Sequence, residues 1–350
     1  DYRLLEDGAF QDFEVRKNLA GKAFKHLSEY DAEVFSWILN SETDSKELRY
    51  GENPHQQAKW LFNQSEEGLH QAKILQGKEL SFNNLVDLTS AVESLALFTK
   101  PAVVSVKHNN PCGIGTGENI ETALKRSLKA DPMSVFGGIV ALNQELNKAC
   151  AEELVGMFLE CIVAPSISTE AKALLATKKN LRVLEWDVLT KGYRPKKDTK
   201  RLSGGTAEQT VDSMKTVFSE WKQVSGEQPD DKTIEALEFS WKAVGRLKSN
   251  AIAVCGQETT LGLGMGQVNR VDAVKSSIDR WQSFHKDYEG PVVLASDAFF
   301  PFSDSIELIA EAGIKWVVQP GGSIKDEAVI EKAKDLGLGM FFTGERHFLH

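Results

Sequence analysis

The sequence predicts an α/β fold with largely parallel sheets, and three observations support this prediction. Short runs rich in β-branched residues recur along the chain, each bounded by Gly, Pro, Asn or Asp, as is typical of buried strands. Longer segments with apolar residues at helical spacing lie between these runs. The composition of the 350 residues, 41% apolar and 26% charged, is that of an ordinary globular protein. A chain of this length favours two or three domains.

The predicted elements alternate along the chain. Residues 10–40 are predicted to be helical, because apolar side chains recur there every three and four positions. The polar stretch 41–47 is predicted to be a linker. Strands are expected at 102–106, 138–142, 251–254, 292–295 and 316–318, and helices at 120–130, 231–245 and 305–313. Strands that alternate with helices favour parallel pairing.

A second break divides the chain near residues 191–230. Residues 191–201 carry a run of charges that predicts a solvated loop, and residues 225–231 are typical of a turn that leads into a helix. The expected parts are a helical tail over 1–47 and two α/β halves over 48–225 and 226–350. Each half contains a strand that runs into a glycine-rich turn, which indicates a weak internal duplication.

The charge balance disfavours several classes of function. The chain has 41 Lys and Arg against 50 Asp and Glu, a net charge of −9, and an isoelectric point near 5.4. This balance disfavours a binder of nucleic acid or of anionic membranes. No stretch approaches the ~20 apolar residues of a membrane-spanning helix, and the first residues lack the pattern of an export signal. We expect a cytoplasmic protein that binds neither nucleic acid nor membrane.

The cysteines do not indicate a metal site. Cys112, Cys150, Cys161 and Cys255 are scattered and form no Cys-x-x-Cys pair, so buried thiols are expected. A zinc deaminase needs His-x-Glu followed by Pro-Cys-x-x-Cys. Pro111-Cys112 has no second cysteine at that spacing, and no histidine begins His-x-Glu. We therefore expect no metal.

The densest polar cluster is KHNNPCGIGTG, residues 107–117, directly after a predicted strand. Side chains at the end of such a strand lie where open α/β sheets bind ligands. Glycines allow close approach of the backbone to a ligand. His108 is suited to proton transfer near neutral pH, and the neighbouring Lys107 can stabilise an oxyanion. The alternative is an ordinary polar loop with a surface lysine.

A second glycine-rich segment, GLGMGQVNR, covers residues 262–270. Its spacing is G-x-G-x-G, which differs from the G-x-G-x-x-G of dinucleotide binders, and no Walker-type G-x-x-x-x-G-K-[ST] occurs. NAD and Walker-type nucleotide binding are therefore poorly supported. The segment can instead present Arg270 and a helix N-terminus to an anion. The alternative is a tight turn with Arg270 in solvent.

Nine segments together resemble one family, the AICAR transformylase domain of the bifunctional enzyme of purine biosynthesis; AICAR is 5-aminoimidazole-4-carboxamide ribonucleotide. The matching strings, in family order, are LRYGENPHQ (48–56), GKELSFNN (77–84), KHNNPCG (107–113), FGGIVALN (136–143), RLKSN (246–250), GMGQVNRVDAV (264–274), SDAFFPF (296–302), PGGS (320–323) and GERHFLH (344–350). Residues 10–40 also resemble the last helices of the preceding cyclohydrolase domain, so we expect a C-terminal fragment or a shortened form.

The resemblance implies formyl transfer from 10-formyltetrahydrofolate to the amine of AICAR, giving formyl-AICAR and tetrahydrofolate. It implies two cytidine-deaminase-like α/β/α subdomains, preceded here by a short helical segment. It also implies a homodimer with shared active sites, and 10-formyltetrahydrofolate as a co-substrate in place of a tightly bound cofactor. The segment SGGTAEQ (203–209) departs from the family pattern and is assigned no role.

The resemblance also implies residue roles at matching positions. Lys107 and His108 resemble the catalytic pair, and the resemblance implies Asn250 as a further catalytic residue. The implied AICAR contacts are Arg49, Tyr50, Gly137, Glu160, Arg270, Phe299, Arg346 and His350. The implied folate contacts are Val271, Asp304, Gly321 and Gly322.

The chemistry agrees with these roles. The AICAR amine must lose a proton as it attacks, which requires a general base such as His108. Lys107 and Asn250 are suitable donors to the oxyanion of the tetrahedral intermediate, and either Lys107 or His108 can protonate the leaving folate nitrogen. The alternatives are a non-catalytic nucleotide-binding module, and a cyclohydrolase or deaminase that acts on purine rings.

Overall fold

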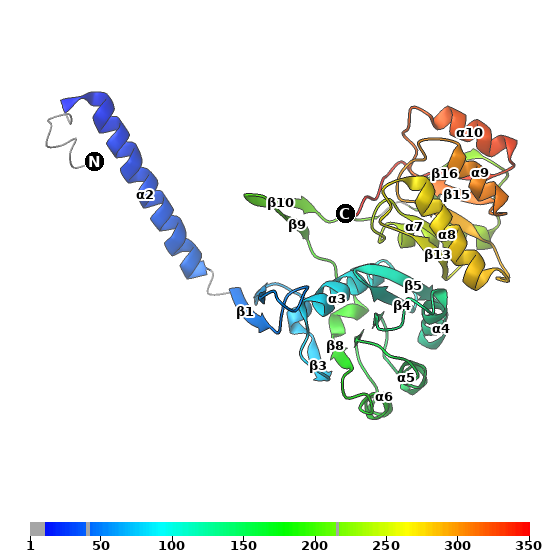
Figure 1. Ribbon diagram of the computed structural model, residues 1–350, viewed down its shortest axis with the longest axis horizontal. Coiled ribbons are helices and arrows are strands. Elements are labelled where there is room, and N and C mark those ends of the chain that lie inside the picture. Colours follow the sequence, from blue (N-terminus) through cyan, green and yellow to red (C-terminus); the bar gives the residue numbers. More distant parts are fainter. Residues whose placement is uncertain (1–10, 40–42, 215–216) are drawn as a thin grey trace. The chain divides into compact units, whose positions relative to one another are not determined.

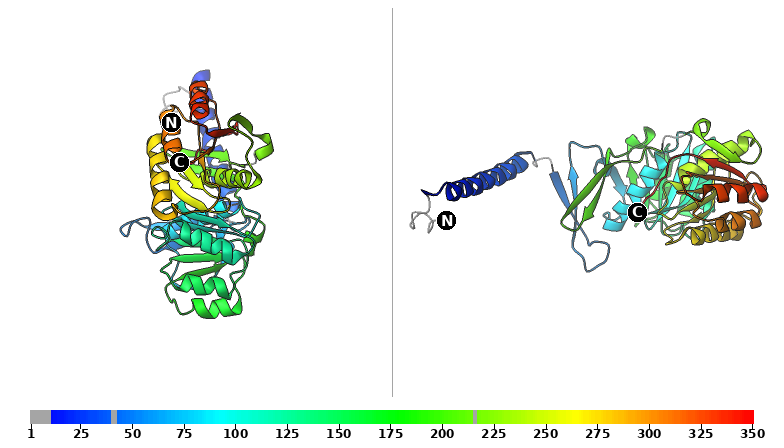
Figure 2. Two further views of the ribbon diagram at one scale, coloured as in Figure 1. Left: turned by 90° about the vertical axis from the view of Figure 1, so that its right-hand side faces the viewer. Right: turned by 90° about the horizontal axis from the view of Figure 1, so that it is seen from above.

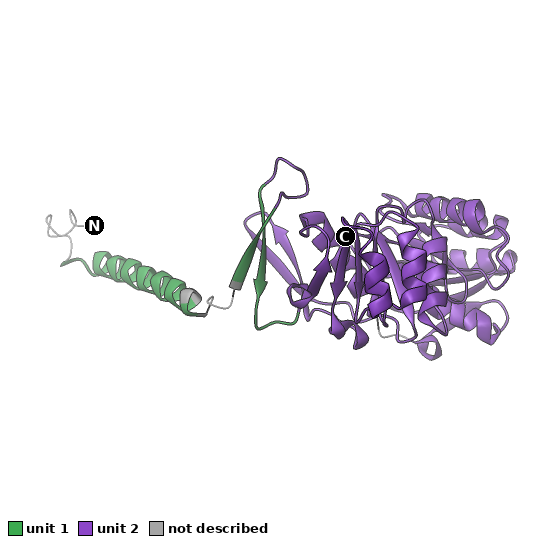
Figure 3. Ribbon diagram, turned by 90° about the horizontal axis from the view of Figure 1, so that it is seen from below, with its two compact units in different colours: residues 1–48, 57–67 green, residues 49–56, 68–350 purple. Residues whose placement is uncertain are grey.

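The computed structural model describes residues 11–39, 43–214 and 217–350 (Figure 1). The chain separates into two compact units, coloured in Figure 3. The first contains the residues up to Leu48 together with Gln57–Glu67, and the second contains Arg49–Gln56 together with Gly68–His350. None of the helices in the described ranges is long and apolar enough to cross a membrane.

The first unit contains one long helix and a two-stranded ribbon. Helix α2 (Phe13–Leu39) confirms the helix expected over residues 10–40. Strand β1 (Thr43–Leu48) pairs with β2 (Ala58–Asn63) in antiparallel register, with Leu48 opposite Ala58. The linker predicted at 41–47 is therefore wrong from Thr43 onward. Backbone pairing with β2 stabilises this strand, while the polar side chains of residues 44–47 are exposed.

The second unit contains two six-stranded sheets with the same strand order. The first has the order β3-β8-β7-β6-β4-β5, and the second β11-β16-β15-β14-β12-β13. The first sheet consists of β3 (Lys73–Gln76), β4 (Ala102–Lys107), β5 (Asn110–Thr116), β6 (Ile139–Leu142), β7 (Cys161–Ala164) and β8 (Arg182–Glu185). The second consists of β11 (Lys222–Ser225), β12 (Ile252–Cys255), β13 (Thr260–Gly264), β14 (Val293–Ser296), β15 (Trp316–Gln319) and β16 (Gly339–Phe342).

Both sheets are mixed, so the prediction of largely parallel sheets is wrong. In the first sheet β6, β7 and β8 pair in parallel, and the other pairs are antiparallel. The second sheet repeats this pattern around β14, β15 and β16. Helical crossovers join the parallel strands, whereas short connections join β4 to β5 and β12 to β13, and these force antiparallel pairing. The shared order agrees with the internal duplication indicated by the sequence.

Helices cover both faces of each sheet, which confirms the α/β class (Figures 1 and 2). They are α3 (Phe82–Leu95), α4 (Ile120–Ala130), α5 (Lys148–Val155), α6 (Thr169–Leu175), α7 (Asp231–Val244), α8 (Arg270–His285), α9 (Asp304–Glu311) and α10 (Asp326–Asp335). One apolar cluster joins α3 and α7 across the two halves. Separate outer clusters lie between the first sheet and α4–α6, and between the second sheet and α8–α10.

Four glycines of the two predicted glycine-rich turns lie in strands: Gly113 and Gly115 in β5, and Gly262 and Gly264 in β13. A Cβ on Gly113 of β5 would lie 2.1 Å from the carbonyl oxygen of Ser127 on α4, and a Cβ on Gly264 of β13 would lie 2.1 Å from that of Ala273 on α8. These glycines therefore let a helix approach its strand closely. The prediction that these glycines form turns is therefore wrong, because all four pair as strands within hairpins.

Two further elements differ from expectation. Strand β9 (Lys197–Leu202) pairs with β10 (Gly205–Thr210) in an exposed hairpin, so the loop predicted at 191–201 is wrong from Lys197 onward. Strand β11 begins at Lys222 and pairs with β16, so the second sheet starts a few residues before the boundary expected at residue 226.

The two halves meet along β5 and β13. The backbone N–H of Thr116 donates to the carbonyl oxygen of Glu258 at 2.9 Å, and Gly115 forms a bridge with Thr259. The N–H of Ile114 donates to the Thr260 hydroxyl at 3.0 Å. These contacts place the hairpin β4–β5 of the first half next to β13 and α8 of the second.

Candidate active site

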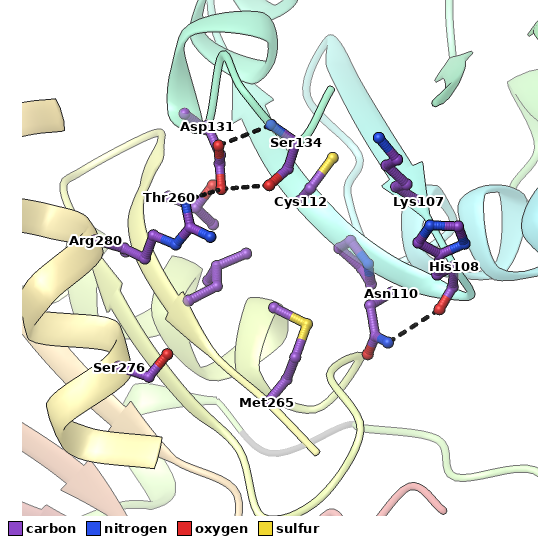
Figure 4. A pocket seen from close by; sticks show the side chains of 14 residues that line it. Lys107, His108, Asn110, Cys112, Asp131, Ser134, Thr260, Met265, Ser276 and Arg280 are labelled. Atoms are coloured by element: carbon purple, nitrogen blue, oxygen red, sulfur yellow. Dashed lines mark hydrogen bonds and ion pairs between the residues drawn. The ribbon is translucent and has the colours of Figure 1, made fainter. Parts of the chain in front are cut away.

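A cavity of about 260 Å³ lies where hairpin β4–β5 meets β13 and α8; we call it the hairpin cavity (Figure 4). The residues that line it are Lys107, His108, Asn110, Pro111, Cys112, Ala130, Asp131, Ser134, Thr260, Gly262, Leu263, Met265, Ser276 and Arg280. The predicted catalytic pair, Lys107 and His108, is therefore at a cavity. Both halves of the duplicated fold contribute to its wall.

The turn of hairpin β4–β5 holds Lys107 and His108, the predicted catalytic pair. Lys107 pairs with Asn110, and the two residues between them both have positive φ, 52° for His108 and 60° for Asn109. This is the geometry of a type I′ turn, which joins twisted strands with only two residues. His and Asn tolerate this backbone region better than most side chains. The turn exposes His108 at the mouth of the hairpin cavity.

Asp87 of helix α3 holds this turn by a hydrogen bond to its backbone. Its carboxylate accepts a hydrogen bond of 2.6 Å from the backbone N–H of Asn109. Burial raises the pKa of Asp87, and the Asn109 N–H and the nearby His108 act against this rise. Asp87 is not predictable from the sequence, because no local pattern marks a helix residue that contacts a turn more than twenty positions away.

Lys107 is directed toward the loop that carries Gly137. Its Nζ donates to the carbonyl oxygen of Phe136 at 2.7 Å. Gly137 has a φ of 74°, and its N–H donates to the carbonyl oxygen of Phe158 at 2.8 Å. The structure thus brings the predicted AICAR contact Gly137 to the predicted catalytic lysine.

Cys112 lines the hairpin cavity close to this pair but is not a nucleophile. Burial raises the pKa of its thiol to about 12, so the reactive thiolate is absent near neutral pH. All four cysteines are free and buried, which confirms the expectation of buried thiols. In the described part of the chain, no group of three or more His, Cys, Asp and Glu residues is placed to hold a metal ion.

A hydrogen-bond chain connects the turn to the second half. The Asn110 side-chain oxygen accepts from the backbone N–H of Lys248 at 3.2 Å. Two residues further on, the Asn250 amide donates to the carbonyl oxygen of Gln267 at 2.9 Å and accepts from Arg270 at 2.8 Å. Asn250 and Arg270 are therefore joined to each other and linked, through Lys248, to the turn that carries Lys107 and His108.

Arg270 is buried, with 7% of its surface exposed, so the alternative that placed it in solvent is wrong. Its guanidinium forms an ion pair with Asp297, which is fully buried, and donates to the Ser296 hydroxyl at 2.8 Å. Because Asp297 balances its charge locally, Arg270 contributes less positive charge to an open surface than the sequence suggested. Asp297 lies in the SDAFFPF string, but its role as a counter-ion was not foreseen.

Glu160 is oriented by a buried arginine. Arg182 of β8 is 9% exposed and places Nη1 2.5 Å from a Glu160 carboxylate oxygen. Its Nε also lies 3.4 Å from the carbonyl oxygen of Glu79. About a third of the Glu160 side chain is exposed, so its carboxylate is held in place and remains accessible.

The other predicted site residues lie outside the hairpin cavity. The Arg49 guanidinium lies 5.0 Å from the centre of the Tyr50 ring, and Phe299 is half-buried. Arg346 lies 4.3 Å over the Phe348 ring. The remaining predicted positions are Val271 and Asp304 in the first turns of α8 and α9, Gly321 and Gly322 with φ of 70° and 95°, and the exposed His350.

The chain is similar to known enzymes of purine biosynthesis. Residues 3–280 match the family model described as AICARFT/IMPCHase bienzyme. The bifunctional purine biosynthesis protein PurH of Nostoc punctiforme is 44% identical over 363 residues, covering 99% of this chain and 70% of the relative. PurH of Enterococcus faecalis is 45% identical over 354 residues, covering 96% of this chain and 68% of the relative.

The duplicated α/β fold, the cavity and these matches define an enzyme of nucleotide synthesis. The chain belongs to the AICARFT/IMPCHase bienzyme family. It is an AICAR formyltransferase of purine biosynthesis and thus a transferase. This confirms the family resemblance seen in the sequence, and the chain spans about 70% of the length of the curated relatives it matches.

Proposed function

We propose that Lys107 and His108 are the proton-transfer pair for formyl transfer from 10-formyltetrahydrofolate to the amine of AICAR. The observation that carries this proposal is the type I′ turn, which presents the two residues together at the hairpin cavity. The turn is rigid, because both of its strands are paired and Asp87 holds the N–H of Asn109. A fixed turn keeps the acid and base groups in a productive geometry.

His108 acts as the general base. The AICAR amine is a weak nucleophile, since its lone pair is delocalised into the ring and the carboxamide. As its nitrogen attacks the formyl carbon, the C–N bond forms and a proton passes to the imidazole. When the intermediate collapses, the bond from the formyl carbon to the folate nitrogen breaks. That nitrogen takes a proton from Lys107 or from His108, and the products are formyl-AICAR and tetrahydrofolate.

Lys107 and Asn250 stabilise the oxyanion of the intermediate. One N–H of the Lys107 ammonium is engaged by the carbonyl oxygen of Phe136, and the group has two further N–H bonds to offer. The Asn250 amide is held on both sides, by Arg270 and by Gln267, so it needs no reorganisation during the reaction. Preorganised donors of this kind contribute strongly to catalysis.

The substrate contacts implied by the resemblance complete the proposal. Glu160, held by Arg182, is an AICAR contact. Because Asp297 neutralises Arg270, the phosphate is bound mainly by Arg49 and Arg346, both of which are exposed. The other proposed AICAR contacts are Tyr50, Gly137, Phe299 and His350, and the proposed folate contacts are Val271, Asp304, Gly321 and Gly322. Folate acts as a co-substrate.

A homodimer with shared active sites fits this distribution. Among the proposed contacts, Phe299, Arg346 and Asp304 do not line the hairpin cavity of their own chain. A second copy that brings these residues to Lys107 and His108 would complete the site. We propose this dimer as the active form, in the cytoplasm.

The test is a formyl-transfer assay with AICAR and 10-formyltetrahydrofolate that follows the appearance of tetrahydrofolate. The His108→Ala variant is expected to lose roughly 10²–10⁴-fold in kcat, as is usual for a missing general base. His26→Ala is the matched control, since His26 is exposed on α2. Turnover of His108→Ala close to that of the control would remove His108 from the mechanism.

A further inference from the structure

The segment Thr343–His350, which we call the C-terminal segment, is anchored by one buried histidine. His347 is 2% exposed, and its Nδ1 lies 2.6 Å from a carboxylate oxygen of Asp212. The imidazole packs against Trp241 of α7, with ring centres 4.9 Å apart. Its Nε2 is buried and has no hydrogen-bond partner among the residues that the structure describes. The Asp212 carboxylate is therefore the group that holds this ring by a hydrogen bond.

Asp212 is suited to accept this bond. It lies in the stretch between β10 and β11 that links the two halves. Burial acts to raise the pKa of Asp212, but the hydrogen bond from His347 and the charges of His347 and Arg194 outweigh it and lower the pKa. The backbone N–H of Met214 adds a hydrogen bond of 3.1 Å. The carboxylate is thus ionised at neutral pH, and it accepts the Nδ1–H of His347.

The C-terminal segment is also fixed along its backbone. The His347 N–H donates to the carbonyl oxygen of Asp297 at 3.0 Å. Ser249 and Leu349 exchange two hydrogen bonds, from the Ser249 N–H at 2.8 Å and from the Leu349 N–H to the Ser249 hydroxyl at 3.1 Å. The residues on either side of His347, Arg346 and Phe348, are exposed. The buried ring therefore sets the direction in which these neighbours project.

We propose that His347 and Asp212 are positioning residues, whose pair holds the C-terminal segment so that Arg346 can bind the AICAR phosphate. This inference rests on the proposed function, which makes Arg346 a nucleotide contact. Neither residue touches the substrate in this scheme. Without the pair, the segment stays attached through Ser249 and Asp297 but samples orientations in which Arg346 points elsewhere. The apparent affinity then falls with the competent fraction.

Two substitutions at position 347 separate the hydrogen bond from the packing. His347→Phe keeps a ring against Trp241 and removes the Nδ1 donor. His347→Asn loses ring area, but its side-chain amide nitrogen lies where Nδ1 lies and can still donate to Asp212. Asp212→Ala removes the acceptor at a position that is half-exposed, so we expect this variant to fold.

The first readout is steady-state kinetics. We expect His347→Phe and Asp212→Ala each to raise KM for AICAR by about 10-fold, as when the competent fraction falls to roughly a tenth, with kcat nearly unchanged. His347→Asn should restore most of the affinity. The double variant should be no worse than either single one, because both remove the same bond. The proposal would be overturned if the substitutions lowered kcat and left KM unchanged, or if His347→Phe and His347→Asn raised KM equally.

The second readout does not depend on activity. Limited trypsin digestion of the full chain, with cleavage after Arg346 followed by mass spectrometry, reports how firmly the segment is held. We expect cleavage there to accelerate in His347→Phe and Asp212→Ala, with unchanged cleavage at exposed lysines of α2. Unchanged cleavage after Arg346 would overturn the positioning pair itself. Faster cleavage without a change in KM would instead refute the role of Arg346 in the proposed function, and with it the functional part of this inference.

Discussion

Replacing Arg270 by Met tests whether this arginine is primarily a structural counter-ion. The substitution keeps an unbranched apolar stem but removes the guanidinium, and so leaves the fully buried carboxylate of Asp297 without its ion-pair partner. The Ser249 hydroxyl, at 2.6 Å, remains as a side-chain donor to that carboxylate. Breaking one side of a buried ion pair costs about 3–5 kcal/mol. A loss of that size is a large part of the ~5–15 kcal/mol by which domains are stable.

The measurement is urea unfolding followed by circular dichroism, with the slope m compared between variants. Arg280→Met is the matched control on the same helix, because Arg280 is 44% exposed and its ion pair with Asp131 is 3.4 Å long. This control should lower the free energy of unfolding by less than ~1 kcal/mol. The double variant Asp297→Asn and Arg270→Met should be more stable, by at least ~1 kcal/mol, than the sum of the two single effects predicts. If Arg270→Met costs no more than the control, or if the double variant is additive, the reasoning fails.

Three further predictions concern packing, orientation and pH. Gly113→Ala should lower the free energy of unfolding by about 1–3 kcal/mol through overpacking. Gly205→Ala is the control, because the space around its Cβ is open, and it should change the free energy of unfolding by no more than ~0.5 kcal/mol. Equal urea midpoints for the two variants would contradict this. Arg182→Met should raise KM for AICAR with kcat retained, because Glu160 loses its orienting partner. An unchanged KM would show that the orientation of Glu160 by Arg182 does not matter for nucleotide binding. The lowered pKa of Asp212 means that the stabilisation it supplies is present above its ordinary pKa of about 3.9 and is lost as pH falls through the lowered pKa. The stability difference between wild type and Asp212→Asn should therefore shrink below pH ~4, and a difference that grows on acidification would refute this.

Local sequence patterns predicted most of the elements but not their pairing. The runs at 102–106 and 251–254 are apolar except for Ser105, and each lies largely in a strand inside its sheet. The spacing of the glycines predicts turns at residues 113 and 264, because spacing alone does not distinguish a close ligand from a close helix. Only the tertiary arrangement of α4 and α8 shows that the space is filled by helix backbone.

The sequence predicted part of the candidate site, as it predicted part of the fold. The polar cluster at Lys107 and His108 indicated a site, and the structure places both residues at a cavity. Their substrate roles stay predictions. The supporting carboxylates were not foreseen, since the partners of Asp87 and Asp212 lie more than twenty and more than a hundred positions away. Hydrogen bonds over such separations depend on how the halves pack, and no local period records them.

The contact of β5 with β13 has a consequence for how the chain avoids self-association. Each of these strands is the terminal member of its own sheet, and an uncovered terminal strand is a template on which foreign chains can assemble. Here the bonds from Thr116 to Glu258 and from Ile114 to Thr260 make each strand the cap of the other. Either half expressed alone would expose one bare edge, so we expect it to precipitate or to pair with itself, whereas mixing the halves during refolding should restore solubility.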